Sequence, residues 1–123
     1  PGWAEAHPDT EFIIYFSPYS ILFWDGMDRQ GETEAMLTML ADTIETLLAY
    51  DNVELQFFMA DTDIITNLDN YADHIHVAGR VTYQLAEAMP TGKYRLTAEN
   101  WRQVLDGLRE FVVHYDYDSI WEA

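Results

Sequence analysis

Apolar residues along the chain form two kinds of pattern: short uninterrupted runs and longer stretches with helical spacing. The run at 12–16 is apolar throughout and rich in aromatic and β-branched side chains, which predicts a strand buried on both faces. It stops at Ser17-Pro18, because proline cannot donate a hydrogen bond to a strand ladder. A second strand is predicted over 53–59, where apolar side chains recur at every second position.

Three stretches carry apolar residues at three- and four-residue spacing, which is typical of amphipathic helices. These predicted helices lie at 32–50, 77–89 and 97–115. Glu32 and Glu34 stand in the first turn of the first of them, where the helix dipole favours acids. Residues 17–31 and 61–76 are predicted as loops, the latter with at most a helical turn. The tail at 116–123 keeps apolar residues, so we expect it to pack.

The predicted order is strand, helix, strand, long loop, helix, helix. A strand–helix–strand crossover of this length joins parallel strands through a right-handed connection. Two parallel strands buried on both faces do not form a stable sheet by themselves. We therefore expect an α/β domain whose sheet is completed by strands outside this chain or by a second copy.

The composition of the chain argues against some classes of binding partner. The chain has 123 residues, the size of one small domain, and 49% of them are apolar, enough for a core. It carries 6 basic residues against 22 acids, a net charge of −16. Nucleic acids and anionic membranes recruit basic surfaces, so neither is an expected partner. With 0 cysteines, disulfides and thiolate chemistry are excluded.

The distribution of acids predicts the charge of the surface, and the first residue bears on the extent of the polypeptide. Residues 30–79 hold ten acids and neither lysine nor arginine, which predicts a solvated acidic surface. The sequence shows neither a signal peptide nor an apolar run of membrane-spanning length. It opens with Pro1 in place of Met, so we expect residues 1–123 to be a piece of a longer protein.

The strongest candidate for chemistry is the pair Asp73 and His76. A carboxylate three residues before a histidine can accept the Nδ1–H of the imidazole and hold its tautomer, leaving the other nitrogen free to take a proton from a hydroxyl. The pair follows the second strand, at the carboxyl end of which α/β sheets place their sites. The alternative is an acid at a helix start beside exposed histidines.

Three stretches match the pattern of a known family: Ser17-Pro18-Tyr19-Ser20-Ile21-Leu22, Asn70-Tyr71-Ala72-Asp73-His74-Ile75-His76 and Tyr94-Arg95-Leu96-Thr97-Ala98-Glu99-Asn100. Through them, most of residues 10–120 resembles the C-terminal part of SGNH/GDSL-type hydrolases, and more narrowly bacterial envelope proteins with an SGNH-like domain. The resemblance implies the C-terminal half of a flavodoxin-like, three-layer parallel sheet. It also implies an extracytoplasmic or envelope location.

By this resemblance, His76 matches the general base of the family and Asp73 its orienting carboxylate, while His74 matches no role. The family's Gly-Asp-Ser nucleophile block and its oxyanion-hole blocks do not occur in this sequence. The chain is therefore expected to be inactive alone, as an incomplete part of an ester or O-acyl hydrolase acting on acylated carbohydrate or another ester. The remaining half of the domain, or a second copy, is expected to cover the open sheet edge.

Other candidates are weaker. Ser17 and Ser20 follow the first strand, but no glycine-flanked elbow accompanies them, so turn chemistry is favoured over a nucleophilic role. An EF-hand starting at Asp61 fails, since its fifth, sixth and twelfth positions are the unsuitable Ile65, Thr66 and Ala72. No cofactor and no metal are predicted.

Two further alternatives stay open. Tyr19, Phe23 and Trp24 form an aromatic loop that either lines a sugar or acyl pocket or fills the core, and core filling is favoured. A degenerate, non-catalytic SGNH-like domain would use such a loop and the acidic surface to bind glycan or a partner protein. A domain assembled only as a homo-oligomer is the other possibility.

Overall fold

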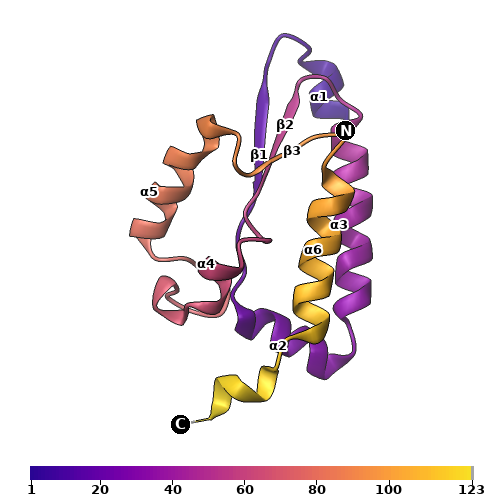
Figure 1. Cartoon of the computed structure of the whole chain (residues 1–123). Coiled ribbons are helices and arrows are strands. Elements are labelled where there is room, and N and C mark those ends of the chain that lie inside the picture. The colour runs from indigo at the N-terminus through magenta and orange to yellow at the C-terminus, as the bar shows by residue number, and fades with distance from the viewer. Residues whose placement is uncertain (123) are drawn as a thin grey trace.

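The computed structural model describes residues 1–122, and within them the chain is an α/β structure with one small mixed sheet (Figure 1). The strands are β1 (Phe12–Phe16), β2 (Val53–Phe57) and β3 (Arg95–Leu96). The α-helices are α1 (Gly2–Ala6), α2 (Ile21–Gln30), α3 (Thr33–Leu48), α4 (Thr62–Thr66), α5 (Gly79–Ala88) and α6 (Trp101–His114). Short 3-10 helices are η1 (Leu68–Asn70), η2 (Met89–Thr91) and η3 (Tyr117–Trp121).

The sheet has the order β1-β2-β3. β1 and β2 are parallel, with Ile14 opposite Leu55, which confirms the predicted crossover. β3 runs antiparallel to β2, with Leu96 opposite Leu55. The expectation of a purely parallel sheet is therefore wrong, because Arg95 and Leu96 are too few to show a strand pattern and are recruited by the β2 edge.

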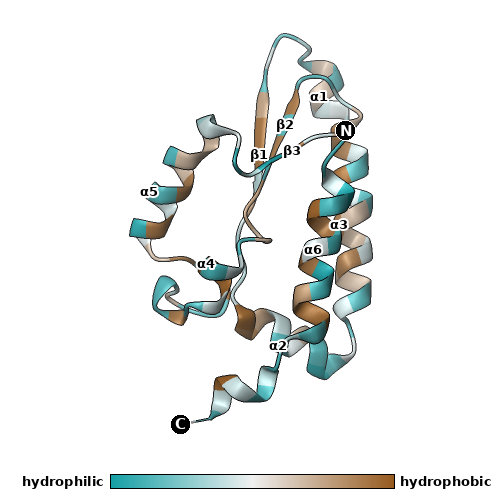
Figure 2. Cartoon of the chain, viewed as in Figure 1, coloured by the Kyte–Doolittle hydropathy of each residue, from teal (hydrophilic) through white to brown (hydrophobic). Residues whose placement is uncertain are grey.

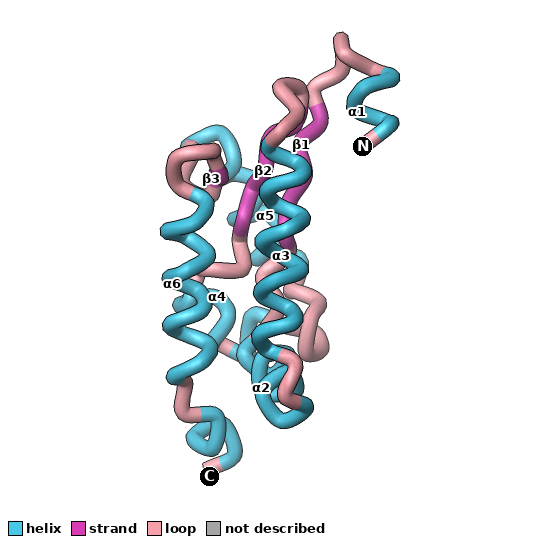
Figure 3. The backbone as a smooth tube through the Cα atoms, turned by 90° about the vertical axis from the view of Figure 1, so that its right-hand side faces the viewer, coloured by secondary structure: helices cyan, strands magenta, loops and turns pink. Residues whose placement is uncertain are grey.

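α3 and α6 cover one face of the sheet, and α5 stands on the other side (Figures 1 and 3). Figure 2 shows β1 as a mostly apolar strand, whereas polar and apolar residues alternate in β2, α3 and α6. The main core lies between the sheet and these two helices, where Ile44, Leu55 and Val112 are completely buried. Burial of these side chains from water stabilises the layer.

The opposite face of the sheet is only partly covered. α5 contributes Val81 and Leu85 to a small cluster with Phe58, just past the end of β2. Ile13 and Tyr15 of β1 point to the same face but are 55% and 60% exposed. The prediction that β1 is buried on both faces is therefore wrong, because α5 packs on the end of β2 and leaves β1 uncovered.

The segment at 17–31, predicted as a loop, contains helix α2, so that prediction is wrong. Ile21 and Trp24, three residues apart, are buried in the core, and Gly31 ends the helix with a left-handed φ of 69°. The Asp25-Gly26 pair, a dipeptide that commonly marks a turn, lies inside the helix. Core packing of one face outweighs the glycine cost there.

The loop at 61–76 holds α4 and η1, slightly more helix than predicted. The tail packs in part, as expected: Tyr117 is buried and its hydroxyl donates to the Val112 carbonyl at 2.6 Å, whereas Trp121 is 64% exposed. Ala123, the last residue of that predicted tail, lies outside the described residues. None of the helices described has both the length and the apolar character needed to cross a bilayer.

Candidate functional site

The candidate site is a tight loop between η1 and α5. Tyr71 and Val77 face each other in an isolated antiparallel bridge. The Ala72 amide donates to the His76 carbonyl at 2.8 Å, and the Ala78 amide donates to the Asn70 carbonyl at 2.7 Å. These bonds close the backbone into a hairpin, with Asp73 at its turn.

The Asp73 carboxylate accepts three hydrogen bonds inside this loop. Its Oδ1 accepts from the amides of Ile75 at 2.9 Å and His76 at 2.8 Å. Its Oδ2 lies 2.7 Å from His76 Nδ1. The backbone amides of Ile75 and His76, and then the His76 ring, hold the pKa of Asp73 well below its usual range.

An ionised carboxylate can only accept hydrogen bonds, so the Asp73 contact assigns the proton to His76 Nδ1 in the neutral ring. Nε2 then carries the lone pair and is free to accept a proton from a bound group. The structure thus brings together the two residues that the sequence singled out. The His76 side chain is 71% exposed and that of Asp73 48%, so the pair is open to solvent.

Two contacts tie this loop to the segment that follows β1. The hydroxyl of the buried Ser20 donates to the His74 carbonyl at 2.6 Å, and the Ser20 amide donates to the same oxygen at 3.2 Å. The Tyr71 hydroxyl donates to the Pro18 carbonyl at 2.6 Å, and burial, followed by the Asp61 charge, raises the pKa of this phenol. These positioning roles of Ser20 and Tyr71 join segments more than fifty residues apart, so no local sequence signal indicated them.

His76 borders a cleft of about 360 Å³ beyond the carboxyl end of β1. The cleft lies between the uncovered face of β1 and α5, and Figure 1 shows this loop at the same end of the sheet as the start of α2. Its lining is mostly apolar and comprises Tyr15, Ser17, Pro18, Phe58, His76, Val77, Thr82, Leu85, Ala86 and Met89. The half-buried Ser17 therefore shares a cleft with His76, whereas the hydroxyl of Ser20 is engaged elsewhere.

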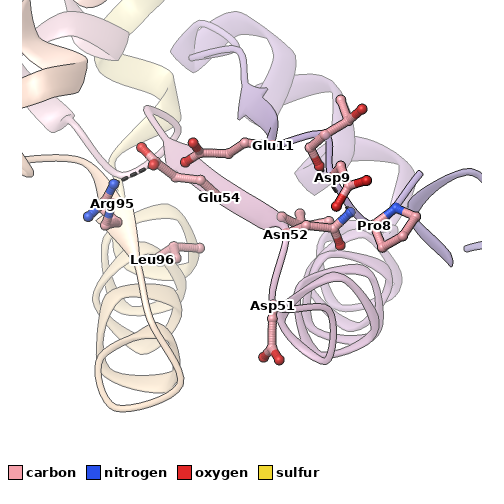
Figure 4. Close-up of a pocket in the computed structure, with 10 residues that line it drawn as sticks. Pro8, Asp9, Glu11, Asp51, Asn52, Glu54, Arg95 and Leu96 are labelled. Carbon is pink, nitrogen blue, oxygen red and sulfur yellow. Dashed lines mark hydrogen bonds and ion pairs between the residues drawn. The ribbon is translucent and has the colours of Figure 1, made fainter.

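A larger hollow of about 450 Å³ lies at the opposite, amino end of β1 and β2 (Figure 4). Arg95 forms an ion pair with Glu54 there, and its hydrogen bond lowers the pKa of that carboxyl. Asp9, Glu11 and Asp51 also line it. Across residues 1–122 no three histidines or carboxylates converge as a metal-binding group.

The three residues of the aromatic loop, which was considered as a sugar or acyl pocket, lie in two different environments. Trp24 is completely buried in the main core, so the core interpretation is correct for this residue. Tyr19 and Phe23 are half-buried and contact each other edge to face, with ring centroids 4.7 Å apart.

Comparison of the chain with known proteins finds no matching family model, no significantly similar curated protein and no significantly similar solved structure.

Proposed function

We propose that Asp73 and His76 are the orienting carboxylate and general base of an SGNH-like hydrolase that cleaves esters or O-acyl groups, with acylated carbohydrate as a candidate substrate. The hydroxyl nucleophile is proposed to come from polypeptide upstream of residues 1–123. The observation that carries this proposal is the Asp73 carboxylate, which binds both the backbone and the ring of His76. The resemblance of the Asn70–His76 stretch to the SGNH pattern adds the reaction class.

The proposed chemistry follows from the tautomer. His76 Nε2 takes the proton of the hydroxyl as its oxygen attacks the acyl carbon, and the charged Asp73 stabilises the resulting imidazolium. His76 then gives that proton to the departing alkoxide, leaving an acyl ester on the nucleophile. Water, deprotonated by the same nitrogen, releases the acid and restores the hydroxyl.

The surroundings of the pair support this assignment. The cleft beside His76 is mostly apolar, and such a surface suits the acyl part of an ester. It extends from the uncovered face of β1 past the carboxyl end of this strand, the edge at which open α/β sheets place their sites. An extracytoplasmic or envelope location is part of the same proposal and rests on the resemblance alone.

The test is hydrolysis of a chromogenic acetyl ester and of an acetylated glycan by residues 1–123, alone and joined to the polypeptide encoded upstream. We expect the chain alone to be inactive and the joined protein to be active. His76→Ala is expected to lower kcat in the joined protein by about 10³-fold or more. His74→Ala, the matched change at the neighbouring exposed histidine, should retain activity.

Three results would contradict the proposal. Unchanged activity in His76→Ala would show that His76 is not the general base. Activity of the chain alone that is lost in Ser17→Ala assigns the nucleophile to Ser17, which shares the cleft. An upstream segment without a nucleophilic serine, together with measurable glycan binding, favours the non-catalytic binding domain.

A further inference from the structure

The outer edge of β1 is open for hydrogen bonding. Among the described strands, β1 pairs with β2 alone. The Phe12 amide donates to the Asn52 carbonyl at 2.8 Å, and the Phe16 carbonyl accepts from the Phe58 amide at 3.2 Å. Backbone groups alternate in direction along a parallel strand, so those of Ile13 and Tyr15 point away from β2, toward the open edge.

The same two residues also present apolar side chains. Ile13 is 55% exposed and Tyr15 60% exposed, both on the face that α5 leaves uncovered. Tyr15 lies beside Phe58, with ring centroids 6.1 Å apart, and lines the apolar cleft. The open edge is therefore flanked by an apolar surface that continues into this cleft.

This edge lacks the features that usually prevent strand pairing. Exposed edge strands commonly carry lysine, proline or inward-facing charge. The sequence of β1, Phe-Ile-Ile-Tyr-Phe, has none of these, although the chain contains 22 acids. A bare, uncharged edge in so acidic a protein indicates a surface suited to a partner strand.

We propose that β1 pairs antiparallel with β1 of a second copy of this chain, about a two-fold axis at Ile14. In this register Ile13 lies opposite Tyr15 of the second copy, and each pair exchanges two backbone hydrogen bonds. Opposed residues share a face, so Ile13 and Tyr15 of both copies gather into one apolar cluster. The strand thus complements itself in backbone direction and in side-chain chemistry, and a closed dimer results.

Charge creates no direct repulsion in this register but opposes association at long range. Glu11, the acid nearest to β1, falls opposite the neutral Ser17 of the second copy, so no carboxylates are directly opposed. Each copy carries −16, but repulsion between surface charges is screened beyond roughly 8 Å at physiological salt. Association through β1 should therefore strengthen as salt rises, whereas binding of a basic partner weakens.

The experiment is sedimentation velocity of the chain from low micromolar to millimolar concentration, at low and high salt. We expect a monomer–dimer equilibrium that shifts toward dimer in high salt. Ile13→Lys should weaken dimerisation by at least about 10-fold, because it places a charge on the edge. Tyr83→Lys, at a side chain of α5 that is 77% exposed, should leave it unchanged.

Amide hydrogen exchange provides a second measurement that a folding defect does not imitate. Dimerisation should protect the amides of Ile13 and Tyr15 in a concentration-dependent way, while those of α6 stay constant. A monomer at millimolar concentration in both salts overturns the proposal, as does association only with polylysine. If a longer polypeptide stays monomeric and its Ile13 and Tyr15 amides are protected, the remaining half of the domain covers the edge of β1 and the proposal is wrong. None of these results bears on Asp73 and His76.

Discussion

The Asp73 carboxylate holds His76 at two points, its ring nitrogen at 2.7 Å and its backbone amide at 2.8 Å. A single side chain therefore sets both the position of the histidine on the loop and the tautomer of its ring. Orientation of this kind is what a general base needs before substrate arrives. The pair is largely exposed, so its value lies in geometry more than in stability.

Asp73→Asn should reverse the tautomer of His76. The new amide donates to the ring, which moves the ring proton from Nδ1 to Nε2 and removes the free acceptor. Long-range proton–nitrogen NMR on the isolated chain reads this change directly. In the active joined protein, kcat should fall by about 10³–10⁴-fold. Asp69→Asn, an exposed acid of the same segment, is the control, and an unchanged His76 tautomer in Asp73→Asn would contradict the assignment.

The Asp73 carboxyl should titrate at lower pH than an unperturbed aspartate. Its folded pKa is depressed, chiefly by the amides of Ile75 and His76, so its contribution to stability is present above the unfolded pKa of about 3.9 and is lost as pH falls toward the folded value. Carbon-13 NMR of the carboxyl groups measures this midpoint. A midpoint for Asp73 at the ordinary aspartate value of about 3.9 would show that the three hydrogen bonds do not form in solution.

Ser20→Ala should destabilise the protein by about 1 kcal/mol, because it removes the buried hydroxyl bonded to the His74 carbonyl, although the Ser20 amide still donates there. Urea denaturation measures the free energy of unfolding. Ser119→Ala removes an exposed hydroxyl that bonds only locally, to the Asp116 carbonyl, and should change that free energy by less than about 0.5 kcal/mol. Equal effects of the two changes would refute the anchoring role of Ser20.

Tyr71→Phe should cost about 1 kcal/mol through loss of its bond to the Pro18 carbonyl. Burial raises the pKa of Tyr71, so the native protein loses stability as pH rises above the unfolded tyrosine value of about 10. The variant should lose less stability over that alkaline range. Tyr83→Phe, at an exposed tyrosine, is the matched control for both urea denaturation and alkaline titration.

The elements that depend on local pattern could be predicted from the amino-acid sequence. β1, β2 and the helices α3, α5 and α6 follow from the spacing of apolar residues, which indicates the side of each segment that packs on a core, although the predicted second strand runs two residues past β2. The contact between Asp73 and His76 could also be predicted from the sequence, because residues three apart in a tight loop can contact each other without support from distant segments.

Features that join distant segments could not be predicted from local pattern. Helix α2 is stabilised because Ile21 and Trp24 pack in the main core. Strand β3 forms because two residues pair with the edge of β2. The cleft beside His76 and the open face of β1 depend on where α5 packs, forty residues or more beyond the first loop. Such contacts are set by the summed packing of the whole chain, which no short window of sequence contains.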